Sequence, residues 1–263
     1  MTFASLIEQL HRSEGRSVSI PAEWAQGRAT FGGLVAALVY EAMRMRVPSE
    51  RELRSLSVSF VGPVAPEEMR VEVQVLRAGK SVTQVQGTAY QGDAVMAVLL
   101  GSFGGGRESG LRVDAEPAPV LTPAESCRRV PFVPGRSPAF TRFFETRWAT
   151  GEAPFSRSQV REIGGWVRLD EPAQPITEAA LLALVDAWPP TVLPMMAAPA
   201  PSSSLAWTIE FVHPLPRATS SDWWMYHAIA EHARDGYAHC RAGLWTPDGE
   251  LVAISRQTYA VFG

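Results

Sequence analysis

The sequence has few cysteines and no surplus of charge of either sign. Its 263 residues include two cysteines, Cys127 and Cys240, which lie far apart and outside the short spacings typical of metal or redox sites. The 24 Lys and Arg residues nearly balance the 27 Asp and Glu residues, so no basic excess indicates a nucleic-acid partner. We therefore expect two reduced structural thiols in a cytoplasmic protein that does not bind nucleic acid.

Long apolar runs and several common catalytic motifs are also missing. No apolar run reaches the about 20 residues that cross a bilayer, and charged residues interrupt the apolar pattern of the N-terminus, unlike in a secretory signal. The five histidines form no metal-binding pair, and no G-x-S-x-G motif indicates a serine hydrolase. The glycines at 104–106 are not followed by the helix of a phosphate-binding loop. We expect no membrane contact, no metal ion and no cofactor.

The first half contains a long apolar helix followed by strands. The helix is predicted over Phe31–Arg46, ahead of Pro48, which cannot continue it. Four strand-like runs follow, with turn residues between the last three, which indicates an antiparallel meander. The runs are Leu53–Val61, Met69–Arg77, Ser81–Tyr90 and Ala94–Phe103.

The second half repeats this order. A helix over Thr177–Trp188 precedes a strand over Ser204–Val212 and three further extended runs. The matching segments are Ser59–Val64 with Glu210–Leu215, Leu76–Ser81 with His232–Tyr237, and Ala94–Phe103 with Glu250–Tyr259. A repeat of more than about 100 residues is too long for a solenoid and indicates a duplicated domain.

A Gly- and Pro-rich stretch separates the two copies. We place the first unit at residues 1–108, a linker at 109–137 and the second unit at 138–263. The second unit is expected to open with strands over Phe140–Trp148 and Ser158–Leu169. A long helix wrapped by a curved antiparallel sheet is the hotdog layout. Two tandem copies predict an α+β double hotdog.

Several motifs, taken in order, resemble those of acyl-CoA thioesterase II-type enzymes. They are F-G-G-x-V at Phe31–Val35, F-x-x-P at Phe60–Pro63, W-x-R at Trp166–Arg168, the strand Ser204–Pro214, which resembles one ending in F-H-R-P, and D-G-x-L-V-A-x-x-x-Q at Asp248–Gln257. They cover nearly the whole chain. The resemblance implies a double-hotdog thioesterase of fatty acid metabolism, a homodimer that hydrolyses acyl-CoA to a carboxylic acid and free coenzyme A.

The resemblance also implies the site. The family's Asp, hydroxyl and Gln residues fall on Asp186, Ser204 and Gln257, and the residues expected to contact substrate are Gly32, Gly33 and Trp207. Two departures leave the polarity of the pocket open. The D-H pair of the hydroxyl strand is replaced by Ala206 and Trp207, and a family His is replaced near Ser57.

The chemistry of these residue types suits thioester hydrolysis. A thioester carbonyl is already electrophilic, so a carboxylate that deprotonates a positioned water is sufficient, with hydroxyl and amide groups to hold the water. Asp186 lies in an apolar helix, near its C-terminal end, where the helix dipole raises the pKa of an acid. Each residue also has a non-catalytic explanation: Asp186 could be an exposed residue at a helix end, Ser204 a loop residue and Gln257 an exposed strand residue. The first copy carries Tyr40 at the helix position of Asp186, which predicts a non-catalytic copy.

Other readings stay open. Gly32 and Gly33 either present backbone N–H groups to a carbonyl or phosphate oxygen, or only allow close helix packing. A non-catalytic acyl-CoA-binding protein would share the fold. A hotdog enoyl-CoA hydratase or dehydratase would need a His paired with an Asp or Glu near a helix start, and the sequence shows no such pair.

Overall fold

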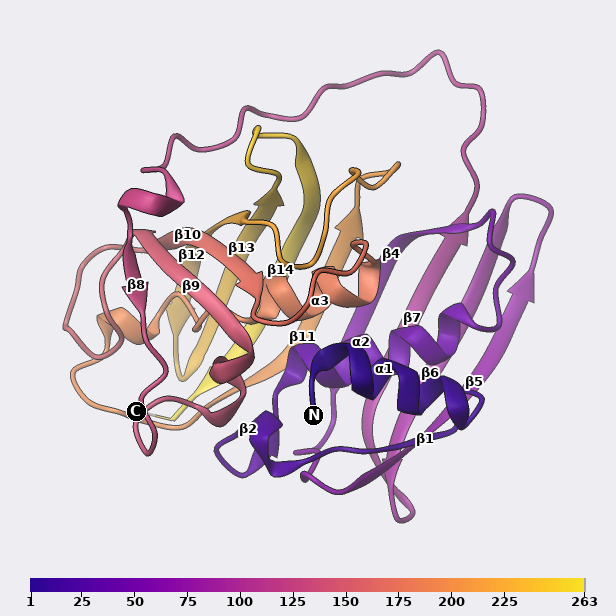
Figure 1. The fold of residues 1–263 in the computed structure, drawn as a ribbon, viewed down its shortest axis with the longest axis horizontal. Helices are drawn as coiled ribbons and strands as arrows, with labels where there is room; N and C mark the ends of the chain where they lie inside the picture. The colour runs from indigo at the N-terminus through magenta and orange to yellow at the C-terminus, as the bar shows by residue number, and fades with distance from the viewer. Residues whose placement is uncertain (263) are drawn as a thin grey trace.

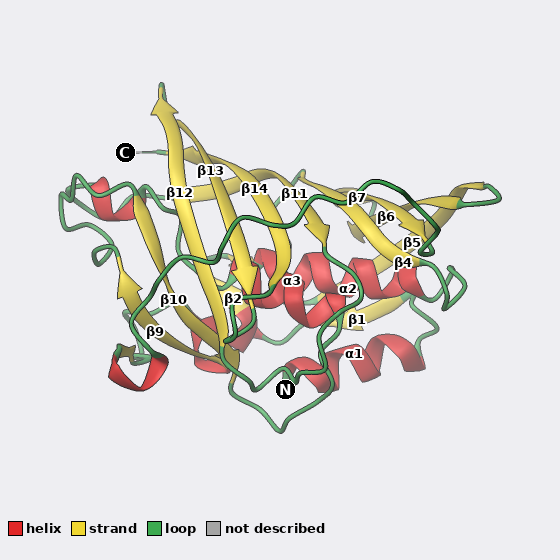
Figure 2. Ribbon diagram, turned by 90° about the horizontal axis from the view of Figure 1, so that it is seen from above, coloured by secondary structure: helices red, strands yellow, loops and turns green. Residues whose placement is uncertain are grey.

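A single antiparallel sheet runs through both halves of the chain. The computed structural model describes residues 1–262, and twelve of its strands join in the order β1-β5-β6-β7-β4-β11-β14-β13-β12-β10-β9-β8. The sheet curves around two helices, α2 and α3, as Figures 1 and 2 show. The α+β double-hotdog expectation is confirmed.

The elements follow the predicted order. The first half contains α1 (Phe3–Arg12), β1 (Ser17–Ser19), the 3-10 helix η1 (Ala22–Trp24), β2 (Ala25–Gln26), β3 (Ala29–Thr30), α2 (Gly32–Arg44), β4 (Glu52–Phe60), β5 (Glu68–Ala78), β6 (Val82–Gln91) and β7 (Ala94–Gly104). The second half contains η2 (Ala124–Ser126), β8 (Arg128–Val130), η3 (Ala139–Phe143), β9 (Phe144–Thr150), β10 (Glu162–Leu169), α3 (Glu178–Asp186), η4 (Leu193–Met195), β11 (Ser202–Phe211), β12 (Trp224–Arg234), β13 (Tyr237–Trp245) and β14 (Leu251–Val261). Strands β5, β6 and β7 form the predicted meander.

The duplication is visible in the pairing of the two copies. Strands β4 and β11 pair with each other in the middle of the sheet, and each also pairs with the last strand of its own copy. Both carry a β-bulge at the matching position, between Leu53 and Ser55 in β4 and between Ser204 and Ala206 in β11. Bulges are built-in features of a strand, so their shared place supports a common origin for the two units.

Three predicted segments differ from the structure. Phe140–Trp148 begins as the 3-10 helix η3, because Phe140 and Phe143 turn inward and stack on Phe31 and Trp24 of the first half, each pair at 4.1 Å. The run from Ser158 becomes a strand only at Glu162, since the backbone before it hydrogen-bonds to the η4 segment. The predicted linker contains β8, which pairs with β9 at the edge of the sheet.

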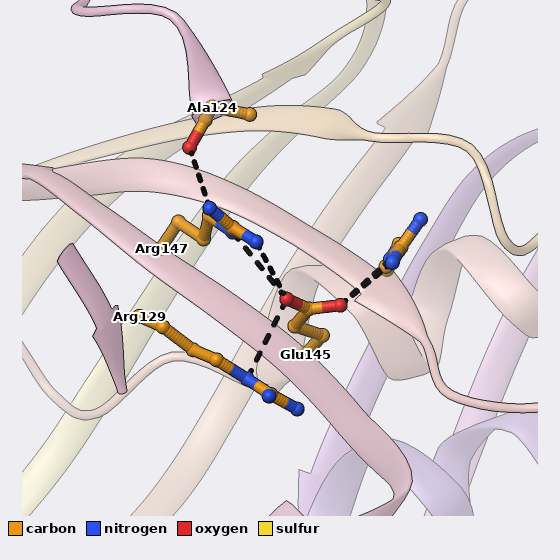
Figure 3. Close-up of polar contacts among 5 residues, drawn as sticks. Ala124, Arg129, Glu145 and Arg147 are labelled. Atoms are coloured by element: carbon orange, nitrogen blue, oxygen red, sulfur yellow. Dashed lines mark hydrogen bonds and ion pairs between the residues drawn. The ribbon is translucent and has the colours of Figure 1, made fainter. Parts of the chain in front are cut away.

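One buried carboxylate ties these edge strands together. Glu145 of β9 is almost fully buried and accepts hydrogen bonds from Arg147 and Arg168, while Arg129 of β8 lies 3.5 Å away (Figure 3). Arg147 also donates to the Ala124 carbonyl of the linker. Burial favours a higher pKa for Glu145, but the arginines outweigh it and hold the pKa below its usual value.

The two long helices supply most of the core. Ten of the 13 residues of α2 and seven of the nine residues of α3 are buried. Thr177 caps α3 by accepting a hydrogen bond from the Ala180 N–H, whereas Phe31 precedes α2 and offers no side-chain cap. The first N–H groups of α2 therefore need partners from elsewhere in the fold. No helix within residues 1–262 combines the length and apolarity required to cross a membrane.

Candidate active site

The last residue of α3 lies against the first turn of α2. Asp186 is half-buried, and its Oδ1 accepts a hydrogen bond of 2.6 Å from Nε2 of Gln257 on β14. The backbone N–H of Gly33 also stabilises the carboxylate. The acid of one copy thus meets the open helix N-terminus of the other, where the positive end of the helix dipole favours an anion.

The pKa of Asp186 is raised to about 7, and burial is the dominant cause. The hydrogen bonds from Gln257 and Gly33 act in the opposite direction and limit the rise. A raised pKa was expected from the position of Asp186 at the end of α3, but its cause in the structure is desolvation. Such a carboxylate is divided between its acid and base forms near neutral pH, as a general base requires.

Gly32 and Gly33 allow this close approach. A Cβ on Gly33 would lie 2.8 Å from the Cβ of Asp186 and 2.5 Å from the ring of Phe31, and a Cβ on Gly32 would lie 3.1 Å from the Asp186 Oδ2. The packing explanation for the two glycines therefore holds. Their N–H groups remain candidates for receiving a substrate oxygen as well, which stays a prediction.

Ser204 lies on the same face of the sheet as Gln257. Trp207 pairs with Gln257 and Ser204 pairs with Tyr259, and cross-strand partners point to the same side. Three residues of regular strand would put Ser204 and Trp207 on opposite faces, but the bulge between Ser204 and Ala206 restores them to one face. Within residues 1–262, the Ser204 side chain makes no hydrogen bond to Asp186 or Gln257.

Two polar residues next to Gln257, Tyr259 and Cys240, were not predicted from the sequence. The Tyr259 hydroxyl donates to Oε1 of Gln257, and the Cys240 thiol donates to the Tyr259 oxygen at 3.6 Å. Both side chains are buried. The period-two pattern of β14 could have indicated Tyr259, which lies two residues after Gln257 and therefore on its face.

An aromatic cluster follows the C-terminal end of α3. Trp188 stacks on Tyr226 at 5.2 Å and lies 6.0 Å from Trp148. Trp207 is fully buried, and its indole N–H donates to Ser255 at 2.8 Å. Trp207 is thus part of the core wall beside Gln257, and its contact with a substrate stays a prediction.

The first copy holds no carboxylate and no amide side chain at the matching positions. Ala97 and Ala253 pair with the equivalent residues Phe60 and Phe211, which aligns β7 with β14. In this alignment Leu53, Gly101 and Phe103 replace Ser204, Gln257 and Tyr259. Counted from the first residue of each helix, Tyr40 of α2 stands at the position of Asp186 of α3. Figure 2 shows α2 and α3 next to each other beneath the sheet, in line with the duplication.

A His beside a helix start does exist, contrary to the sequence analysis. Nε2 of His213 lies 3.8 Å from Glu178, the first residue of α3. The same nitrogen lies 2.8 Å from the Leu53 carbonyl oxygen, which can only accept, so Nε2 carries a proton that it donates there. The pair could not be found from sequence, because a long segment separates its members.

The two cysteines are buried and unpaired, as expected. Among residues 1–262, no group of three or more His, Cys, Asp or Glu side chains has the arrangement of a metal site.

Family models match both halves of the chain. Residues 20–104 match the model of the acyl-CoA thioesterase N-terminal domain, and residues 124–261 match that of the C-terminal domain. A comparison with curated proteins found no match.

Solved structures share the fold over nearly the whole chain. A hot dog fold protein of unknown function from Alicyclobacillus acidocaldarius is 26% identical, with a TM-score of 0.82 over 95% of this chain and 94% of that chain. A candidate thioesterase II from Thermobifida fusca is 22% identical, with a TM-score of 0.83 over 100% and 98%. An acyl-CoA thioesterase II from Mycobacterium marinum is 20% identical, with a TM-score of 0.72 over 94% and 92%. With both halves matched in order by the two domain models, this chain belongs to the acyl-CoA thioesterase family.

Proposed function

We propose that the protein hydrolyses an acyl-CoA thioester to a carboxylic acid and free coenzyme A. The observation that carries this proposal is Asp186, a carboxylate with a pKa of about 7 that is held by Gln257 at the N-terminus of α2. A base of this strength is half ionised near neutral pH, which suits the removal of a proton from water. The family of the chain supports the thioester as the bond that is cleaved.

The reaction then needs one water and no covalent intermediate. Asp186 takes a proton from the water as its oxygen attacks the thioester carbonyl carbon. Gln257 holds the base, and Ser204 orients the water from the neighbouring strand. The carbonyl oxygen gains negative charge, which the N–H group of Gly32 stabilises, while the N–H group of Gly33 holds the Asp186 carboxylate. The C–S bond breaks, and the proton held by Asp186 passes to the departing thiolate.

The proposal assigns the chemistry to the second unit, residues 138–263. The matching positions of the first unit hold Tyr40, Leu53 and Gly101, which offer no carboxylate and no amide side chain. The first unit, residues 1–108, contributes the α2 N-terminus against which Asp186 lies. Trp207 and the rings near Asp186 form the wall for the acyl group.

Two alternative functions make different predictions. A non-catalytic acyl-CoA-binding protein would bind the substrate without releasing thiol. A hydratase would use His213 with Glu178, but the Nε2 proton of His213 is engaged by the Leu53 carbonyl oxygen, which leaves this nitrogen unable to act as a base. Hydrolysis at Asp186 is therefore the function that we favour. Cytoplasmic location, a role in fatty acid metabolism and a homodimer are further expectations from the resemblance.

The test is thiol release from a panel of short, long and aromatic acyl-CoAs. We expect turnover by the wild type, and a loss of about 10²-fold or more in kcat for Asp186→Asn, because the amide cannot accept the water proton. Asp93→Asn, the same change in the exposed turn between β6 and β7, is the matched control and retains full activity.

Two outcomes would overturn the proposal. Unchanged thiol release by Asp186→Asn would remove Asp186 from the mechanism. Tight acyl-CoA binding by calorimetry with no turnover on any member of the panel would favour the binding protein.

A further inference from the structure

The orientation of the Gln257 amide decides whether Asp186 faces a hydrogen-bond donor or an acceptor. An amide side chain has a donating nitrogen at one end and an accepting oxygen at the other, and it can turn over by half a rotation. An ionised Asp186 only accepts hydrogen bonds, so Nε2 of Gln257 faces it, at 2.6 Å. The amide oxygen then points away from Asp186 and toward Tyr259, the next residue of β14 that faces inward.

Tyr259 is the donor that this oxygen meets. Its hydroxyl donates to Oε1 of Gln257, and its own oxygen accepts from the Cys240 thiol at 3.6 Å. The donors therefore run in one direction, from Cys240 to Tyr259 to Gln257 to Asp186. Cys240, Tyr259 and Gln257 are buried, where an unpaired polar group is costly. Reversal of the amide would therefore require the Tyr259 hydroxyl and the Cys240 thiol to turn their protons as well.

We propose that Tyr259 is a positioning residue for hydrolysis, which locks the Gln257 amide with its nitrogen toward Asp186 and so holds Asp186 as a carboxylate. The inference rests on the proposed function of Asp186 and adds a residue to which the resemblance assigned no role. Tyr259 does not touch the reacting atoms. It acts only through Gln257.

The alternative orientation shows why the lock matters. With the amide reversed, Oε1 would face Asp186, and two acceptors would confront one another unless Asp186 took up a proton. A reversed amide therefore favours the protonated acid, which cannot accept a proton from water. The hydroxyl of Tyr259 disfavours this state, because its oxygen would have to accept from the amide nitrogen and its proton would have to turn toward the Cys240 sulfur, which is only a weak acceptor.

The first copy supports a role tied to Gln257. Phe103 occupies the position of Tyr259 there, and Gly101 occupies that of Gln257. The fold thus already accommodates a phenylalanine ring at the equivalent place, where the ring of Phe103 lies 6.2 Å from that of Tyr40. The hydroxyl is present only in the copy that has an amide to orient.

The other titratable groups around Asp186 do not obscure a pH test. They are Tyr226 on β12, Cys240 on β13 and Tyr259 on β14, while α2 contributes only backbone at Gly33. Burial raises the pKa of each of these three side chains above its ordinary value, so all three stay neutral near pH 7. The acidic limb of the kcat/KM profile therefore reports Asp186.

The test is Tyr259→Phe, which removes one oxygen atom. We expect kcat for acyl-CoA hydrolysis to fall about 10-fold with KM nearly unchanged, since the loss of one buried hydrogen bond is worth about 1.4 kcal/mol. The acidic limb should move to higher pH, because Gln257 lowers the pKa of Asp186 less when its amide can turn over. Tyr237→Phe is the matched control, an exposed tyrosine of β13, and should change neither quantity.

A double-mutant cycle separates positioning from a loss of fold. If Tyr259 acts through Gln257, then Tyr259→Phe has no further effect on kcat in a Gln257→Ala background. Additive losses, or a Tyr259→Phe variant with an unchanged acidic limb and kcat, would overturn the inference. Failure of the proposed function looks different: the wild type would release no thiol, or Asp186→Asn would remain active.

Discussion

Burial of Asp186 raises its pKa into the range that suits a general base and lowers the stability of the protein at neutral pH. Burial disfavours its ionised form, and the amide of Gln257 and the N–H of Gly33 compensate only in part, so the pKa rises from 3.8 to about 7. In the unfolded chain Asp186 ionises near its ordinary pKa. The folded protein therefore loses stability as pH rises from about 4 to about 7, where the unfolded state releases the proton more readily.

Asp186→Asn should remove this penalty. The variant has no charge to desolvate, so its free energy of unfolding relative to wild type should grow by roughly 2 kcal/mol between pH 5 and pH 7, at no more than about 1.4 kcal/mol per pH unit. Urea unfolding at pH 5, 7 and 8 measures the difference. Asp93→Asn, in an exposed turn, should show no such trend. A difference between Asp186→Asn and wild type that does not depend on pH would contradict the raised pKa.

At the scale of elements, α2 receives its N-terminal partner from α3. Phe31 supplies no cap, and Asp186 approaches the first turn of α2 across the boundary between the two copies. This approach needs glycine at Gly32 and Gly33, because a Cβ on either would press on Asp186 or on the adjacent rings. Each hotdog unit thus completes the other, and neither helix alone builds the site.

Gly33→Ala tests this arrangement. In an unobstructed helix the change would stabilise by about 1 kcal/mol, because alanine is the better helix former. Here the added methyl group would meet Phe31 and Asp186 at 2.5 and 2.8 Å, so we expect a destabilisation of about 1–3 kcal/mol and a lower kcat. Gly106→Ala, in open space, should leave both unchanged. A stabilised and fully active Gly33→Ala variant would contradict the close approach of Asp186 to the first turn of α2.

At the scale of the whole molecule, two connections join the copies. One is the backbone pairing of β4 with β11, which makes the sheet continuous. The other is a set of aromatic contacts, in which Phe140 stacks on Phe31 and Phe143 stacks on Trp24. Because Phe31 also borders Gly33, the aromatic contacts between the copies and the site share a residue. We therefore expect the two halves to unfold together.

Phe140→Ala should weaken this connection. Loss of the buried ring is expected to destabilise the protein by about 3–5 kcal/mol and to reduce thiol release, since Phe31 loses its stacking partner. Phe262→Ala, the same change on an exposed ring, should shift stability by less than about 0.5 kcal/mol. Denaturant unfolding followed by far-ultraviolet circular dichroism and tryptophan fluorescence should show one coincident transition. Two separate transitions would indicate that the copies fold independently.

Local patterns predicted most of the elements and failed where tertiary contacts took over. The alternation of β5, β6 and β7 and the apolar runs of α2 and α3 were sufficient, because each pattern is repeated over many residues. The start of β9 was not predictable, since Phe140 and Phe143 fit a strand equally well but turn toward rings from the other half. The pair of His213 and Glu178 was missed because only folding brings them together.

The sequence by itself determined the duplication, the family resemblance and the polar residue types, because these are properties of order along the chain. The tertiary structure decided their relations. It brought Asp186 onto Gln257 and the α2 N-terminus, and it turned Ser204 onto their face through a bulge that shifts side-chain alternation by one residue. It also put Tyr259 behind the amide, since only the pairing of β13 with β14 brings Cys240, Tyr259 and Gln257 together and sets the direction in which each hydrogen bond runs.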